Sequence, residues 1–192
     1  MNFLSGNLTA VEFLGTLNKS VSTLAAFAFI GSLLATSFLL PEREGSFEKG
    51  SLALRKKLRI FGIIWLATSA FQIILTLANI LGTSLLDAFE MTSLKSFLTQ
   101  VDLGKYLGYQ LALIAVVVVG INLVNKVLAS TIFLGLSLLA LVIPVFQSHS
   151  AASGSHSLAI GALVVHVAGL SLWVGGILAL LLISTDDRTI AL

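Results

Sequence analysis

The sequence predicts an all-α integral membrane protein, a helical bundle of about five transmembrane helices with its N-terminus outside the cell. The 192 residues are 57% hydrophobic and only 10% charged, and their mean hydropathy is +1.03. Soluble domains carry about 25% charged residues, whereas apolar stretches of about 20 residues are typical of membrane-spanning helices. Five such stretches are present: 20–40, 60–81, 106–124, 128–146 and 158–183.

The composition also argues against several classes of protein. The formal net charge of +2 is too small to predict nucleic-acid binding, and the absence of cysteine rules out disulfides, thiolate metal ligands and cysteine nucleophiles. Only Met1 and Met91 could supply thioether sulfur, so a methionine-rich metal site is not expected. The predicted spans contain no carboxylate, and no glycine-rich nucleotide loop follows a strand. We therefore expect no enzyme and name no catalytic residue.

The first part of the chain passes from a mixed segment to an apolar span and then to a basic loop. Residues 1–19 are mixed in character, and we expect a short interfacial helix there. The first span, 20–40, has no charged residue and offers Gly31 as a small surface for close helix contact. It ends at Pro41, which cannot continue the helical hydrogen bonds. The segment 41–59 holds six of the eleven basic residues, which predicts a cytoplasmic loop.

The second span, 60–81, carries one polar stripe. Its members recur every three or four residues and therefore share one helix face: Trp65, Ser69, Gln72, Thr76 and Asn79. In lipid, such a face has to contact other helices or a wet cavity. We expect mainly interhelical hydrogen bonds, and the alternative is a polar pathway for a metal ion or substrate along Gln72 and Asn79.

The third and fourth spans, 106–124 and 128–146, follow an external loop. That loop, 82–105, mixes charged and apolar residues, which favours a short amphipathic helix near 85–98. Pro144 is expected to kink the outer end of the fourth span, because proline removes a helical hydrogen bond.

The distribution of basic residues predicts the orientation. The last span, 158–183, completes one transmembrane domain over 20–183 and leads into a cytoplasmic tail, 184–192. If 41–59 is inside, the inside segments hold eight basic residues: Arg43, Lys49, Arg55, Lys56, Lys57, Arg59, Lys126 and Arg188. The outside segments hold only three: Lys19, Lys95 and Lys105. This bias puts the N-terminus and the loop 148–157 on the external face.

All three histidines lie in the segment that leads into and forms the last span. His149 and His156 are seven residues apart in a flexible loop of small residues, and His166 lies about nine residues, roughly 13 Å, into the span. An imidazole inside a bilayer costs free energy, and neutral imidazole is a common ligand of copper, zinc and nickel. We therefore predict that these histidines bind a metal ion, with copper(II) or zinc favoured over copper(I).

One stripe on the last span contains His166, Gly169, Trp173 and Gly176, at intervals of three, four and three residues. Glycines on that face would let a neighbouring helix approach closely. For Trp173 and the following Gly175 and Gly176 we expect ordinary helix packing.

The motifs around these residues resemble the copper-resistance D (CopD) family: Ser148-His149-Ser150-Ala151, His156-Ser157-Leu158-Ala159, His166 and Leu172-Trp173-Val174-Gly175-Gly176-Ile177-Leu178. They look most like the form that actinobacteria fuse to a CtaG-like cytochrome-oxidase assembly domain. A looser similarity reaches back to Leu39-Leu40-Pro41, to Trp65 and to the segment 78–82.

The resemblance implies a multi-pass protein of the bacterial plasma membrane that takes up copper, confers copper tolerance or delivers copper to a respiratory oxidase. It implies a metal-binding role for His149, His156 and His166, with Trp173, Gly175 and Gly176 as structural motif residues. The implied partners are the lipid bilayer, the copper ion, an external copper chaperone and oxidase assembly factors. Family members usually have further spans, so we interpret the chain as a fragment that lacks a C-terminal membrane domain.

Two other functions stay open. The first is a membrane assembly subunit without a metal, in which the loop histidines are incidental and His166 donates a hydrogen bond to Gln72 or Asn79. The second is a haem-b electron-transfer protein, which needs axial histidines in pairs from facing helices, whereas only His166 lies within a span. We rank copper handling first, assembly second and haem binding third. The direction of copper movement, the copper oxidation state and the oligomeric state stay open.

Overall fold

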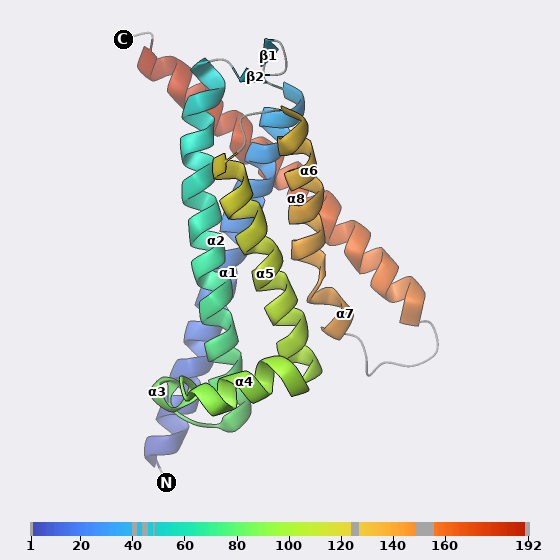
Figure 1. Cartoon of the computed structure of the whole chain (residues 1–192). Helices are drawn as coiled ribbons and strands as arrows, with labels where there is room; N and C mark the ends of the chain where they lie inside the picture. Colours follow the sequence, from blue (N-terminus) through green and yellow to red (C-terminus); the bar gives the residue numbers. More distant parts are fainter. Residues whose placement is uncertain are drawn as a thin grey trace.

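The computed structural model is an all-α bundle, which confirms the predicted fold class (Figure 1). The structure describes the backbone of residues 2–39, 42–43, 46–47, 49–123, 127–148 and 156–190, and the side chains of 10–38, 54–121, 127–146 and 158–185. Its elements are α1 (Asn2–Leu34), η1 (Ala35–Leu39), β1 (Glu42–Arg43), β2 (Ser46–Phe47), α2 (Lys49–Leu81), α3 (Leu85–Ala88), α4 (Met91–Gln100), α5 (Asp102–Leu123), α6 (Val127–Val142), α7 (Val145–Ser148) and α8 (His156–Ile190).

Four helices in the described part of the chain are long and apolar enough to cross a membrane: Ala10–Phe38, Leu54–Leu81, Asp102–Ile121 and Leu158–Thr185. Helix α6 is also apolar but has only 16 residues, or about 24 Å. It ends two residues before Pro144, and α7 begins one residue after it. The fourth predicted span is therefore interrupted at the proline where the sequence predicts a kink. The chain is therefore an integral membrane bundle of four long spans and one shorter apolar helix.

The N-terminal helix differs from the sequence expectation. Helix α1 runs unbroken from Asn2 into the first predicted span, so the structure shows no separate interfacial helix over 1–19. Single glycines in this segment lower helix propensity by about 1 kcal/mol each but leave the backbone hydrogen bonds in place. The candidate span begins at Ala10 and includes Glu12 and Lys19. The expectation that the spans contain no carboxylate is wrong for this reason.

The basic segment 41–59 is partly helical instead of a loop. Helix α2 begins at Lys49, so most of these basic residues lie on its first turns. Leucine, alanine, lysine and arginine, which dominate this stretch, are good helix formers, and no proline interrupts them.

Two of these basic residues tie α2 to the other helices. The buried Arg55 donates a hydrogen bond from Nη2 to the carbonyl oxygen of Ile121 in α5 over 2.7 Å. Lys57 donates from Nζ to the carbonyl oxygen of Leu182 in α8 over 3.1 Å. The carbonyls near a helix C-terminus have no partner within the helix, so the Arg55 guanidinium also satisfies a carbonyl at the end of α5.

The segment 82–105, which the sequence predicts as an external loop with one short helix, contains two short helices, α3 and α4. Helix α2 stops before Gly82, whose φ of +62° is the left-handed conformation that glycine adopts without strain. The Ser84 hydroxyl then caps α3 by accepting a hydrogen bond from the backbone N–H of Asp87 over 3.3 Å. Helix α4 lies across this end of the bundle (Figure 1).

Helix α1 is the centre of the bundle. It packs against α2, α8 and α6, whereas α2 and α8 have little direct contact. Phe29 of α1 packs on Trp65 of α2, with ring centroids 5.8 Å apart and the rings tilted by 50°. Both side chains are almost completely buried in a core that α5 and α6 complete through Ile114, Val117, Ile121 and Leu134.

Helices α1 and α8 cross at a pair of glycines, Gly31 and Gly175. A Cβ added to Gly31 would lie 1.8 Å from the carbonyl oxygen of Gly175, and one added to Gly175 would lie 2.3 Å from the carbonyl oxygen of Phe27. The two backbones are therefore in direct contact, as small residues permit between membrane helices. This crossing fixes where the histidine-bearing helix lies on the bundle.

Candidate functional site

The predicted metal residues belong to the start and middle of α8. His156 is the first residue of this helix, and His166 follows ten residues later, about 15 Å along the helix axis. The His166 side chain is described and is exposed on the surface of the bundle. His149 and the side chain of His156 lie outside the described residues, so the predicted three-histidine site stays a prediction.

The helical position of His156 restricts how these histidines could bind copper. Metal–nitrogen bonds of about 2 Å hold two imidazole nitrogens on one ion within about 4 Å of each other. An axial separation of about 15 Å between two Cα atoms on one helix is more than two imidazole side chains can bridge around such an ion. His156 and His166 therefore fit successive positions on a path, whereas His149 and His156 could share one ion.

The proposed hydrogen bond from His166 to the second span is not formed. Within the described residues, His166 has no hydrogen-bond partner, and Gln72 bonds to α1 instead. Helix α1 lies between α2 and α8, which keeps His166 away from the polar stripe of α2.

The stripe that contains His166 faces outward. Gly169 is exposed with open space where a Cβ would be added, and 68% of the Trp173 surface is exposed. A Cβ on Gly176 would meet only the end of the Leu34 side chain, at 3.6 Å. The expectation that Gly169 and Gly176 allow close approach of a neighbouring helix is wrong. Gly175, on the adjacent face of α8, makes the close contact with α1 instead.

One member of the polar stripe of α2, Gln72, forms an interhelical hydrogen bond of the kind that the sequence predicts. Asn18 of α1 donates from Nδ2 to the carbonyl oxygen of Thr68 and to Oε1 of Gln72, both over 2.9 Å. Gln72 in turn donates from Nε2 to the Thr76 hydroxyl over 3.4 Å. The sequence did not identify Asn18 as the partner, because residues 1–19 were placed outside the first span. A side-chain amide within a sequence of high helix propensity could have indicated an interhelical hydrogen bond at this position.

A groove of about 280 Å³ lies beside this network, along the seam between α1 and α2. It is lined by residues of both helices: Val11, Glu12, Gly15, Thr16, Lys19, Gln72, Leu75, Thr76 and Asn79. Glu12 and Lys19 contribute opposite charges to this groove, and neither was predicted as a site residue. The residues that the structure describes include no cluster of three histidine, cysteine, aspartate or glutamate side chains that could hold a metal ion.

The architecture defines a class of protein, a helical membrane bundle whose last helix begins with one histidine and carries a second within the span. Residues 12–159 match the family model described as copper resistance protein D-like, N-terminal domain. This range covers most of the chain, which therefore belongs to the copper resistance protein D-like family and is a copper-resistance membrane protein. No curated protein and no solved structure matches the chain.

The family match includes two of the three predicted metal residues and excludes the third. It includes α2 to α7 and most of α1, and it contains the positions of His149 and His156. It ends on the first turn of α8, seven residues before His166. The family assignment thus applies to the bundle and the histidine loop, whereas a role for His166 depends on its motif and its position within the span.

Proposed function

We propose that this protein handles copper at the bacterial plasma membrane as a multi-pass transport or delivery protein. His149 and His156 capture the ion on the external face, and His166 receives it deeper in the membrane. The main support is the family match over 12–159, which spans both loop histidines. Copper is the transported ion in this proposal, and no catalytic step is assigned to the chain.

The geometry of α8 supports a relay instead of a single three-histidine centre. The distance of about 15 Å between His156 and His166 along the helix is about half the thickness of the hydrocarbon core. His166 is therefore near mid-depth if His156 lies at the membrane surface. An exposed imidazole at that depth is costly unless it has a ligand or a protein partner, which favours a role in copper passage.

We also propose that the outward face of α8 works with another membrane domain. The resemblance suggests a CtaG-like oxidase assembly domain or a separate oxidase assembly factor, supplied by an external copper chaperone. The exposed Trp173 on the same stripe as His166 is consistent with such a contact. The same observation would favour an assembly subunit without a metal, which is the second candidate function.

Replacing His166 by alanine is expected to slow copper entry into proteoliposomes by at least about tenfold, because one binding position on the path is lost. External copper capture by His149 and His156 should be retained. The readout is copper accumulated inside the vesicles, together with copper tolerance of cells that produce the variant. Val165→Ala is the matched control, because Val165 is exposed on the same turn and has no metal-binding group. Unchanged transport and tolerance in His166→Ala would exclude a transmembrane role for this histidine.

A further inference from the structure

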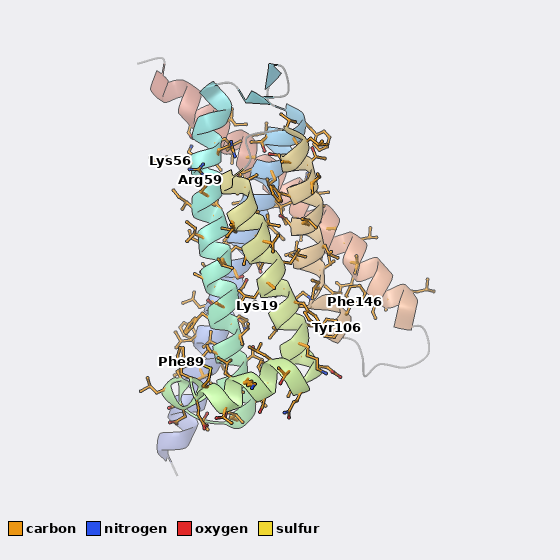
Figure 2. All side chains as sticks on the ribbon, viewed as in Figure 1. Lys19, Lys56, Arg59, Phe89, Tyr106 and Phe146 are labelled. Carbon is orange, nitrogen blue, oxygen red and sulfur yellow. The ribbon has the colours of Figure 1, made fainter. Side chains whose placement is uncertain are left out.

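The groove between α1 and α2 lies at one surface of the membrane. The N-terminal turns of α2, which carry its basic residues, lie at the other surface. Asn79 follows Arg59 by twenty residues on α2, and this helical distance of about 30 Å equals the thickness of the hydrocarbon core. Glu12 lines the groove together with Asn79 and so lies at the same surface. Figure 2 shows Lys19 far from Lys56 and Arg59, toward the end of the bundle that carries Phe89 and Tyr106.

The two charges of the groove occupy different depths. Lys19 follows Glu12 by seven residues, so it lies about 10 Å further into the membrane along α1. Both side chains are exposed, and both line the groove. Between them are hydroxyl and amide groups of Thr16, Gln72 and Thr76, and the Asn18–Gln72 hydrogen bond fixes the two helices at this level.

This vertical order of charges matches a zwitterionic phospholipid. In such a lipid the phosphate is bonded to the glycerol and lies next to the hydrocarbon, while the amine is at the outer end of the head group. Helical side chains lean toward the helix N-terminus, so the long Lys19 side chain can bring its ammonium outward, toward the level of Glu12. A phosphate beside the Lys19 ammonium and a lipid ammonium beside the Glu12 carboxylate would then each meet the opposite charge within one head group. The apolar Val11 and Leu75, which also line the groove, suit the adjoining glycerol and acyl carbons.

A metal cation fits the groove less well. Glu12 is the only carboxylate among its lining residues, and the Lys19 ammonium in the same groove would repel a divalent ion. The remaining polar groups are amides and hydroxyls, which are weak ligands for copper.

We propose that this groove binds the head group of a phospholipid with a primary ammonium, of the phosphatidylethanolamine type. Lys19 donates to the phosphate, and the Glu12 carboxylate and the Asn79 side-chain oxygen accept from the ammonium. The primary amine is preferred over a trimethylammonium because it has N–H donors for these oxygens. The site is separate from the histidines of α8 and does not depend on copper.

The test is lipid titration of the detergent-purified protein by native mass spectrometry, with phosphatidylethanolamine, phosphatidylcholine and phosphatidylglycerol. The parent should prefer phosphatidylethanolamine. Glu12→Gln should weaken phosphatidylethanolamine binding by about tenfold and leave phosphatidylglycerol binding unchanged, whereas Lys19→Gln should weaken both. Glu90→Gln and Lys95→Gln, which change equivalent charges on the nearby α4 region outside the groove, are the matched controls and should bind as the parent does.

Three results would overturn the proposal. The first is equal binding of the three lipids by the parent, and the second is an equal loss in the control variants. The third is displacement of the lipid by soluble phosphoethanolamine at equal concentration, which would identify an aqueous solute as the ligand. Elution of each variant as a single species with the parent's helical circular dichroism excludes misfolding as the cause of a loss.

Discussion

Replacing Gly31 by leucine is expected to destabilise the protein more than any other single change to the crossing of α1 and α8. The new Cβ alone would lie 1.8 Å from the carbonyl oxygen of Gly175, and backbone atoms cannot move aside as a side chain can. Overpacking of a core commonly costs about 1–3 kcal/mol, and a backbone clash belongs at or above the upper end of that range. Thermal unfolding in detergent, followed by circular dichroism, should show the loss, with α8 separating from α1.

Gly169→Leu is the matched control for this prediction. Gly169 lies on α8, the helix that contributes Gly175 to the crossing. No atom lies within 4 Å of the position of a Cβ added to Gly169. A surface substitution of this kind usually changes stability by no more than about 0.5 kcal/mol. A tolerated Gly31→Leu, or a Gly169→Leu that is equally damaging, would contradict the glycine crossing between α1 and Gly175.

The second large effect is expected from Arg55→Met. Arg55 is only 3% exposed, and its guanidinium donates to the carbonyl oxygen of Ile121 over 2.7 Å. The substitution removes a hydrogen bond from a charged group and leaves a carbonyl near the end of α5 without this donor, for a loss of about 2 kcal/mol. Methionine retains much of the apolar stem, so the loss should reflect the guanidinium more than packing.

Lys56→Met separates this effect from a general loss of positive charge. Lys56 is the neighbouring residue on α2, and it is exposed. Its replacement should leave the unfolding temperature in detergent nearly unchanged, since exposed charges contribute little to stability. Equal shifts for both variants would show that Arg55 acts through charge alone and not through its bond to α5.

The polar face of α2 could be predicted from the sequence because helical periodicity determines which residues share a face. The spacing of Gln72 and Thr76 predicts interhelical hydrogen bonds on their shared face. The structure confirms this for Gln72, which accepts from Asn18 of α1, whereas the Gln72–Thr76 bond lies within α2. The partner helix could not be derived in the same way, because periodicity contains no information about neighbours. The roles of Asn18 and of the groove residues Glu12 and Lys19 were not predicted, because the first span was expected to begin at residue 20 and the structure extends it back to Ala10.

The glycines of α8 show the same limit. Their spacing placed Gly169 and Gly176 on the face of His166, which is correct for a helix. Which face meets α1 depends on how α8 crosses the bundle, and the contact is made by Gly175. The histidine stripe therefore faces outward, a feature that no local pattern could reveal.

The central claim is that the histidines of the α8 segment bind copper. The most direct measurement is the metal content and optical spectrum of the detergent-purified protein beside a variant with His149, His156 and His166 all replaced by alanine. The account predicts copper that co-purifies with the parent and is absent from the variant. A Soret band in the parent would indicate haem instead, and equal copper in the two proteins, or none in the parent, would contradict a histidine copper site.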